Sequence, residues 1–170
     1  MGAKEFLPRA TRVLPAGDWV ARTARDTVTL DFDERFRRRR RYTGANGTEF
    51  LLDLDEAVAL RDGDGLLLEG GGVILVRAAP EPLTQITAAT PELLMRLAWH
   101  LGNRHLPTQI EGSRILIRED HVITAMLRGL GATVEAVQAP FHPEGGAYGE
   151  HKGHGHSHDH GDGHHHHHDH

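Results

Sequence analysis

Cysteine is absent from these 170 residues. Its absence excludes disulfides, thiolate metal sites and cysteine nucleophiles together. No apolar run approaches the roughly 20 residues that a membrane-spanning helix needs. The opening residues, MGAKEFLPRATRVL, contain no apolar segment of the kind found in secretory signals. We therefore expect a cytoplasmic protein with no membrane partner.

Aromatic residues are also scarce, at 5% of the chain, and hydrophobic residues reach 38%, which predicts modest, mainly aliphatic cores. The formal net charge is −5, so no overall basic excess favours nucleic acid as a partner. The turn at residues 62–65 lacks the later ligands of a calcium loop, and the glycines at 70–72 lack the Lys of a phosphate loop. No catalytic constellation is present, and we expect a protein that is not an enzyme.

Histidine, in contrast, is abundant at the C-terminal end, which holds eleven of the 15 histidines. The residues between them are Gly, Ser, Asp and a single Lys152. No apolar side chain is available to offset the entropy of ordering, so we expect residues 150–170 to form a disordered His-rich tail. Neutral imidazole binds Ni²⁺, Zn²⁺ and Cu²⁺ well, which makes this tail a candidate metal binder. Its candidate ligands are His151, His154, His156, His158, His160, His164, His165, His166, His167, His168 and His170.

A terminal histidine run can also be a purification tag, which carries no information about the fold. A tag is usually one uninterrupted run after a short linker. Here only five histidines are consecutive, and Asp159, Asp162 and Asp169 interrupt the segment. Histidines alternate with other residues before the run. This pattern favours a natural metal-binding tail.

Residues 1–79 have the pattern of a small all-β sandwich or barrel domain. Apolar residues alternate at Val28, Leu30 and Phe32, which places them on one face of a strand. The pair Asn46-Gly47 is a hairpin signal. The expected strands cover residues 19–24, 26–32, 49–54, 66–68 and 73–76.

Five consecutive arginines, Arg37 to Arg41, stand out in this domain, directly after Asp31, Asp33 and Glu34. Neighbouring side chains of a strand point to opposite faces, so the run cannot present all five charges as one stripe. A solvated or edge strand is the favoured interpretation. An acidic protein partner and nucleic acid are the alternatives.

Residues 80–149 have a different pattern, which begins after a proline-marked boundary at 78–82. Thr90-Pro91 predicts a helix start, with Gly102 as its stop, and a second helix pattern runs from Asp120 to Gly131. Strand candidates flank both helices. The order β-α-β-β-α-β predicts a ferredoxin-like domain with both helices on one face of an antiparallel sheet. The whole chain is thus expected to be of the α+β class. The strand candidates are 83–87, 108–111, 115–118 and 134–137.

Four histidines lie outside the tail: His100, His105, His121 and His142. None belongs to a recognisable zinc motif, and each taken alone is typical of an ordinary surface histidine. His105 lies between a glycine and a proline, so we expect an exposed turn. One imidazole is far short of the ligand set that a divalent metal takes, but a two-fold dimer doubles each ligand near its axis. A tethered tail can supply the remaining ligands, which predicts an exchangeable site at a dimer interface.

Several blocks of the sequence resemble the UreE family of urease accessory nickel metallochaperones. They are His-Leu-Gly-Asn-Arg-His-Leu-Pro at 100–107, Asp-His-Val-Ile-Thr-Ala-Met-Leu at 120–127, Leu-Gly at 130–131, and Pro-Phe-His-Pro-Glu-Gly-Gly-Ala-Tyr-Gly at 140–149, followed by the tail. The blocks have the order and spacing of the family. The likeness spans the whole chain and is looser in the N-terminal part.

This resemblance implies an N-terminal β domain that contacts protein partners, and a homodimer formed through the ferredoxin-like domain. It assigns the main metal ligand to His105 of both protomers. Some members carry a further His-x-His pair at the start of the second helix. Here His121 matches its second position, but Glu119, a harder ligand, stands at the first, which weakens the case for that second site.

The function implied is that of a chaperone that binds Ni²⁺ and passes it, through the urease accessory GTPase, to the apo-urease assembly complex. One alternative is a His-rich protein for metal storage or buffering. Another is a peptide-binding folding chaperone for urease subunits, acting through the β domain. A metal-dependent hydrolase is disfavoured, since three fixed ligands and a general base are lacking. Nickel comes from the resemblance alone: histidine sites intrinsically favour Cu²⁺, and we expect Cu²⁺ or Zn²⁺ to substitute in vitro.

Overall fold

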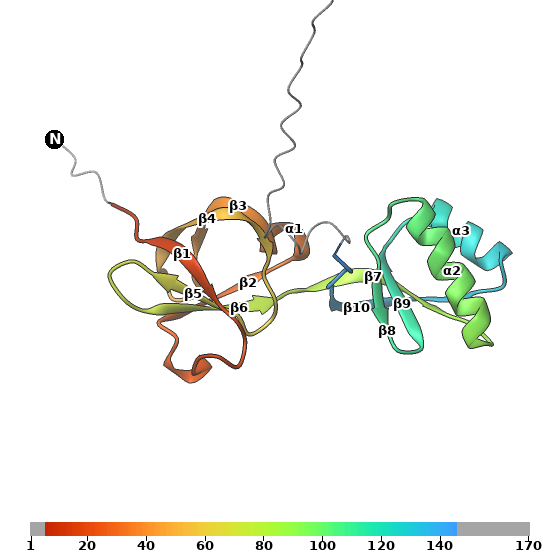
Figure 1. Cartoon of the computed structure of the whole chain (residues 1–170), viewed down its shortest axis with the longest axis horizontal. Helices are drawn as coiled ribbons and strands as arrows, with labels where there is room; N and C mark the ends of the chain where they lie inside the picture. The colour runs from red at the N-terminus through yellow and green to blue at the C-terminus, as the bar shows by residue number, and fades with distance from the viewer. Residues whose placement is uncertain (1–5, 146–170) are drawn as a thin grey trace, which may run out of the picture.

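The computed structural model describes residues 6–145, which form an α+β protein with two sheets side by side (Figure 1). The first is a curled six-stranded sheet with the order β2-β6-β5-β1-β4-β3. It is mixed, because β1 runs parallel to β4 and β2 parallel to β6. Its elements are β1 (Arg9–Leu14), η1 (Ala21–Thr23), β2 (Asp26–Leu30), α1 (Phe32–Arg35), β3 (Phe36–Thr43), β4 (Glu49–Ala59), β5 (Gly65–Leu68) and β6 (Val73–Ala78).

The curl of this sheet encloses a mainly aliphatic core. Strand alternation sends Phe50, Leu52 and Leu54 of β4 inward, and Leu30 and Ile74 meet them from β2 and β6. These side chains are at most 6% exposed, so the small β domain expected from the sequence has a closed interior. Burial of apolar area is the dominant favourable contribution to its stability.

The hairpin between β3 and β4 turns at Asn46-Gly47, as predicted, with Gly47 at φ 88°. The buried Asp26 carboxylate stabilises this turn through hydrogen bonds. It accepts hydrogen bonds from the main-chain N–H groups of Thr27 at 2.7 Å, Asn46 at 3.0 Å and Thr48 at 3.1 Å. A Cβ at Gly44 would lie 2.2 Å from an Asp26 oxygen, so only glycine fits there.

Two local predictions for this part were wrong. Residues 19–24 do not form a strand: the short 3₁₀ helix η1 lies there, and Trp19 donates to the carbonyl of Gly63. Phe32 has left the strand and opens helix α1, because Asp31 and Glu34 form a reciprocal capping box. Strand β1 was not predicted, since of its residues only Ala10 is buried.

The second sheet confirms the ferredoxin-like prediction. Its order is β10-β7-β9-β8, every neighbouring pair is antiparallel, and both helices lie on one side of it (Figure 1). Ile86, Leu97, Leu101 and Leu127 are the centre of its core. The elements of this ferredoxin-like part are β7 (Pro80–Thr87), α2 (Pro91–Asn103), β8 (Gln109–Glu111), β9 (Arg114–Arg118), α3 (His121–Gly129) and β10 (Thr133–Pro140).

None of the helices within residues 6–145 has the length and apolarity to cross a membrane.

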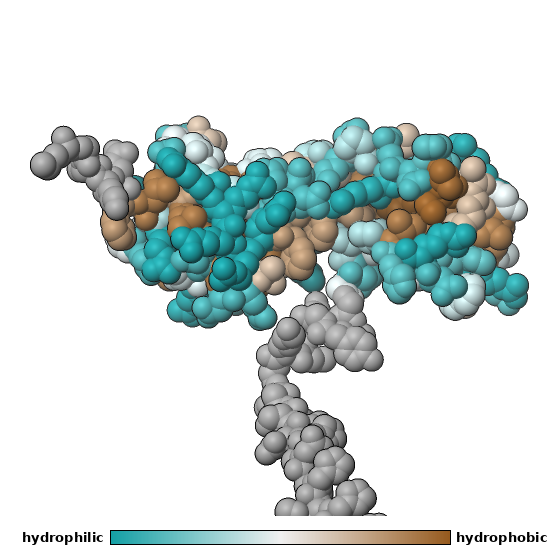
Figure 2. Space-filling view, turned by 90° about the horizontal axis from the view of Figure 1, so that it is seen from above, coloured by the Kyte–Doolittle hydropathy of each residue, from teal (hydrophilic) through white to brown (hydrophobic). Residues whose placement is uncertain are grey.

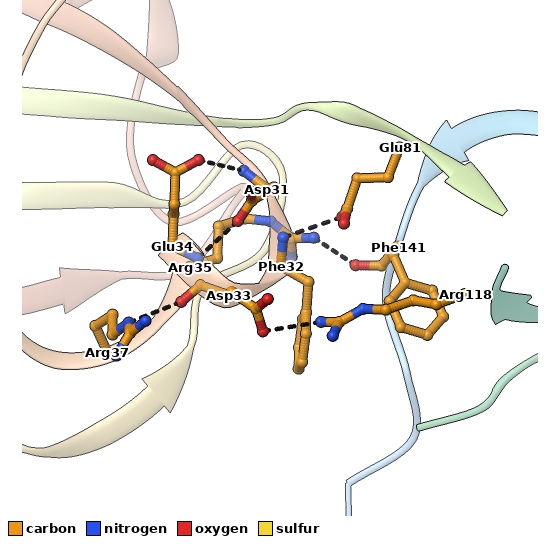
Figure 3. Close-up of polar contacts among 9 residues, drawn as sticks. All are labelled: Asp31, Phe32, Asp33, Glu34, Arg35, Arg37, Glu81, Arg118 and Phe141. Carbon is orange, nitrogen blue, oxygen red and sulfur yellow. Dashed lines mark hydrogen bonds and ion pairs between the residues drawn. The ribbon is translucent and has the colours of Figure 1, made fainter. Parts of the chain in front are cut away.

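The two sheets meet at a joint built around α1 and the end of β10 (Figure 3). The rings of Phe32 and Phe141 pack edge to face, with centroids 5.7 Å apart. Arg118 lies over both rings and pairs with Asp33 at 2.9 Å. The guanidinium of Arg35 is fully buried and donates across the joint to the carbonyl of Phe141.

Candidate metal-binding site

His105 follows helix α2 in an unusual backbone conformation. Its φ is 56°, and it is the one non-glycine residue with positive φ in residues 6–145. For a residue with a Cβ, this left-handed conformation is less favourable by roughly 1–2 kcal/mol. Such strain persists where the surrounding structure imposes it, and it gathers at functional sites. The imidazole is exposed to solvent.

The end of α2 explains how the backbone reaches this conformation. The N–H of Leu106 bonds to the carbonyl of Leu101 at 3.5 Å, and the N–H of His105 bonds to that of Gly102 at 3.0 Å. These are the two bonds of a Schellman motif, with His105 at the position that usually holds glycine. Leu106 packs into the core beside Leu101, which anchors the turn. The predicted stop at Gly102 is therefore wrong: Gly102 is helical, and the chain turns at His105.

Helix α3 ends with the same motif and supplies an internal comparison. Ala132 bonds to Leu127 at 3.0 Å, and Gly131 bonds to Arg128 at 3.0 Å. Gly131 has φ 96°, so glycine occupies there the place that His105 takes after α2. A histidine at this position is not required by the helix end itself, which points to a role for its side chain.

His121 and Glu119 lie at the other candidate position, the start of α3. They line the same surface hollow of about 530 Å³, together with Glu135. The carboxylate of Asp120 between them accepts hydrogen bonds from the N–H groups of Val122 and Ile123 at 2.9 and 3.0 Å, so it caps the helix. Helix capping, rather than metal ligation, accounts for Asp120.

No group of three or more His, Asp or Glu side chains suited to a metal ion occurs within residues 6–145 of one chain. His100 lies within α2 and contacts Trp99 edge to face. His142 is half-buried at the joint, with its Nδ1 3.3 Å from a guanidinium nitrogen of Arg35. Burial, followed by the charges of Arg35 and Arg61, lowers the pKa of His142. His142 therefore lies among the contacts of the joint.

The segment that leads toward the tail passes beside the loop of His105. The N–H of Glu144 donates to the carbonyl of Thr108 at 2.7 Å, three residues beyond His105. The N–H of His142 donates to the side-chain oxygen of Gln109 at 2.7 Å. The eleven predicted ligands of the tail, His151 to His170, lie outside the described residues.

Helix α2 also exposes a group of apolar side chains. Met95 is 68% exposed, Trp99 64%, and Ile110 of the adjacent β8 51%. Met95 and Ile110 line a second surface hollow, of about 460 Å³. Figure 2 shows apolar surface at the end of the molecule formed by the second sheet and its helices. Exposed apolar side chains gathered in this way are typical of a surface that another protein covers.

The joint residues Arg35 and Arg118 were missed by sequence reasoning. Arg35 precedes the arginine run and is not distinguished from it by composition. The one available signal is the pair Asp31 and Glu34, whose capping-box spacing predicts a helical turn that would set Arg35 apart from the strand. Its partners come from the far end of the chain and have no local signature.

Comparison with known proteins gives a consistent result. The family model of the UreE urease accessory protein N-terminal domain matches residues 6–79, and that of the C-terminal domain matches residues 81–170. A urease accessory protein UreE of Bradyrhizobium sp. (strain ORS 278) is 61% identical over 142 residues, which cover 84% of this chain and 67% of that protein. Its counterpart from Rhodobacter capsulatus is 53% identical over 144 residues, covering 85% and 88%. The urease accessory protein UreE of Rhodopseudomonas palustris (strain HaA2) is 56% identical, and the match covers 65% of that protein. The chain therefore spans about two thirds of the length of this relative.

Proposed function

Since this chain belongs to the UreE family of urease accessory proteins, which are not enzymes, we propose that it is a metallochaperone that binds Ni²⁺ and delivers it for assembly of the urease metallocentre. The observation that carries this proposal is His105, held exposed in a left-handed conformation that the fold would more easily give to glycine. A neutral imidazole is a suitable ligand for Ni²⁺.

One His105 cannot hold nickel alone, and the proposal therefore includes a homodimer formed through the ferredoxin-like domain, residues 80–149. A two-fold axis beside His105 brings two imidazoles together. The exposed Met95 and Trp99 support this geometry, because they lie on the helix that ends next to His105 and would be buried by a second copy. Their burial would contribute roughly 25 cal/mol per Å² of apolar area.

The paired His105 side chains are the core of the proposed site, and the tail adds ligands to it. Glu144 is bonded to Thr108, so the chain leaves the folded part beside the loop of His105. Histidines attached at such a point reach the metal at a high effective concentration. A site made of His105 pairs and tail histidines is open and exchangeable, unlike a closed tetrahedral site, and open ligation suits handover.

The proposed recipients are the urease accessory GTPase and the apo-urease assembly complex, in the cytoplasm. The glycines at 70–72 lack the Lys of a phosphate loop. GTP hydrolysis is accordingly assigned to the partner. His121 and Glu119 are proposed as a weaker secondary site at the 530 Å³ hollow.

The test is nickel titration with molar mass followed in parallel. Four proteins are compared: the full chain, a version ending at Gly149, His105→Ala, and the matched control His100→Ala on the preceding helix. We expect one tight Ni²⁺ per dimer in the full chain, the Gly149 version and the control, and its loss in His105→Ala. Retention of that tight metal by His105→Ala would overturn the assignment.

Metal storage by the tail is the competing function, favoured by the density of histidines there. Urease activation in cells separates the two. We expect His105→Ala to abolish activation at limiting nickel, and tail deletion to leave it detectable. The reverse result would assign the function to the tail and reduce the protein to a metal buffer.

A further inference from the structure

Strand β3 forms one edge of the curled sheet, since it pairs with β4 alone among the described strands. An edge strand presents a row of main-chain N–H and C=O groups that another extended chain can pair with. Seven of its eight residues are exposed, and Tyr42 is the buried exception. The arginine run Arg37–Arg41 therefore lies on an accessible sheet edge.

The arginines of this run divide into two groups by their partners. Arg41 pairs with Glu49 of β4 at 2.9 Å. Arg39 lies opposite Asp53, whose pKa is lowered by a hydrogen bond from Arg9 and further by the charge of Arg39. These residues share one face of the strand, and carboxylates of the same sheet offset their charge.

Arg40 lies on the other face, and Arg38 falls where the pairing of β3 with β4 breaks register. Neither makes an ion pair within the described part of the chain. The guanidinium of Arg40 rests over the ring of Tyr42 at 5.7 Å, which orients it along the strand. Two exposed positive charges that make no ion pair among the described residues are complementary to an acidic ligand.

Apolar side chains continue this surface at the start of the strand. Phe36 is 48% exposed and stacks on Phe32 with centroids 6.0 Å apart. Val58, 38% exposed, lies on β4 opposite Arg37. Charged residues alone would serve to keep an edge from aggregating. An exposed aromatic ring and valine do not serve that purpose and instead favour contact with a partner.

We propose that the β3 edge, defined here as Phe36, Arg38, Arg40 and Val58, binds an extended acidic segment of a partner protein by strand addition. The main chain of the segment pairs with β3, its carboxylates meet Arg38 and Arg40, and an apolar residue at one end packs on Phe36. This surface lies on the first sheet, whereas His105 follows a helix of the second, so partner capture and metal binding use different parts of the chain (Figure 1).

A protein segment fits this surface better than nucleic acid. A nucleic acid has no peptide groups to pair with the free main-chain N–H and C=O groups of the β3 edge, whereas an extended protein segment does. In Figure 2, which views the side where β3 and β4 lie in Figure 1, hydrophilic residues cover this region.

The test uses the full chain and a synthetic peptide of roughly ten residues in which Glu alternates with Val, followed by Leu. Binding is measured by calorimetry, and amide hydrogen exchange is followed over residues 36–43. We expect slowed exchange on β3 when the peptide binds, and at least about a tenfold weaker affinity for Arg38→Glu/Arg40→Glu. The matched control is Arg12→Glu/Arg22→Glu, which reverses two exposed charges of the same domain and is expected to bind as the parent does.

Three probes distinguish the alternatives. A peptide of the same composition with proline at every other position cannot pair its main chain, and we expect it not to bind. A single-stranded RNA oligonucleotide is expected to bind at least tenfold more weakly than the acidic peptide. Equal affinity for the RNA, or peptide binding without protection of residues 36–43, would overturn the proposal. Nickel binding by Arg38→Glu/Arg40→Glu is expected to be unchanged, which separates this surface from the metal site.

Discussion

The guanidinium of Arg35 donates to the main-chain carbonyl of Phe141, and this bond links helix α1 to the residue that directly follows β10, the last strand of the second sheet. The same guanidinium donates to the carbonyls of Leu30 at 3.2 Å and Leu60 at 3.0 Å. Burial lowers the pKa of Arg35, and the nearby charge of Glu81 opposes that shift. A buried cation is acceptable here because its donors are distributed over several carbonyl oxygens.

Arg35→Met should therefore destabilise the protein. Methionine fills much of the same volume but leaves the carbonyls of Leu60 and Phe141 without their donor, at a cost of about 1–3 kcal/mol. Urea unfolding checks this expectation. Arg37→Met is the matched control, since Arg37 is exposed and bonds to the carbonyl of Asp33 at the surface; its effect should stay within about 0.5 kcal/mol. Equal unfolding midpoints for the two variants would show that the joint does not depend on Arg35.

The joint should also respond to pH through His142. Its pKa in the folded protein lies below the ordinary 6.5, because of burial and then the charges of Arg35 and Arg61. The unfolded chain then takes up a proton before the folded chain does. The stability contributed by neutral His142 is complete above pH 6.5 and is lost as pH falls through the lower folded pKa. NMR titration of the ring should give that lower pKa, and Arg35→Met should raise it toward 6.5. A folded pKa at or above 6.5 contradicts the contact.

Protonation of Asp26 should lower the stability of the first sheet at acidic pH. Burial raises the pKa of this carboxyl, but hydrogen bonds from Asn46, Thr27 and Thr48 outweigh it and bring the pKa to about 2, from 3.8. Its contribution is therefore present above about pH 4 and disappears as the pH falls toward 2. Asp26→Asn should lower stability at pH 7 by about 1–3 kcal/mol and flatten the loss of stability between pH 4 and 2. Urea unfolding at a series of pH values tests this, and an unchanged acid slope would count against it.

Gly44→Ala should disrupt the same turn, because its new methyl group would collide with the Asp26 carboxylate. A Cβ at position 44 would lie 2.2 Å from an oxygen of Asp26, a carboxylate already held by three main-chain donors. The side chain cannot yield without losing those bonds, so a loss of roughly 2 kcal/mol or more is expected. Gly102→Ala is the control, because a Cβ there meets nothing within 4 Å and the residue is helical. In thermal unfolding, Gly44→Ala should have a clearly lower midpoint temperature than Gly102→Ala.

The ferredoxin-like half was predictable because its signals are local. Thr90 and Asp120 cap the two helices as their positions predict, and the apolar spacing of each helix matches its buried face. In the first half, β1 has only Ala10 buried and is paired in parallel with β4, so nothing in its own residues marks it. Parallel pairing over such a distance along the chain depends on tertiary packing.

The candidate site was predicted in part. An exposed turn at His105 follows from its place between glycine and proline. Its left-handed backbone could not be predicted, since Gly102 is the residue that local preference would place at the end of the helix. The burial of Leu106 against Leu101 extends α2 past that glycine and shifts the turn to His105. The joint was unpredictable for the same reason: Arg35 and Phe141 are brought together only by the packing of the two sheets.

The helix ends of α2 and α3 allow the strain at His105 to be separated from its chemistry. His105→Gly removes the Cβ penalty of about 1–2 kcal/mol but adds freedom to the unfolded chain, so stability should be unchanged or raised by up to about 1 kcal/mol. The reciprocal variant Gly131→His should lose about 1 kcal/mol or more, since it places a Cβ at φ 96° in the same motif. Thermal unfolding of both variants gives the stability difference, and nickel titration gives the binding. If His105 is kept for its imidazole, His105→Gly loses the tight metal while folding at least as well as the parent. A clear loss of stability in His105→Gly would instead show that the histidine side chain supports the fold.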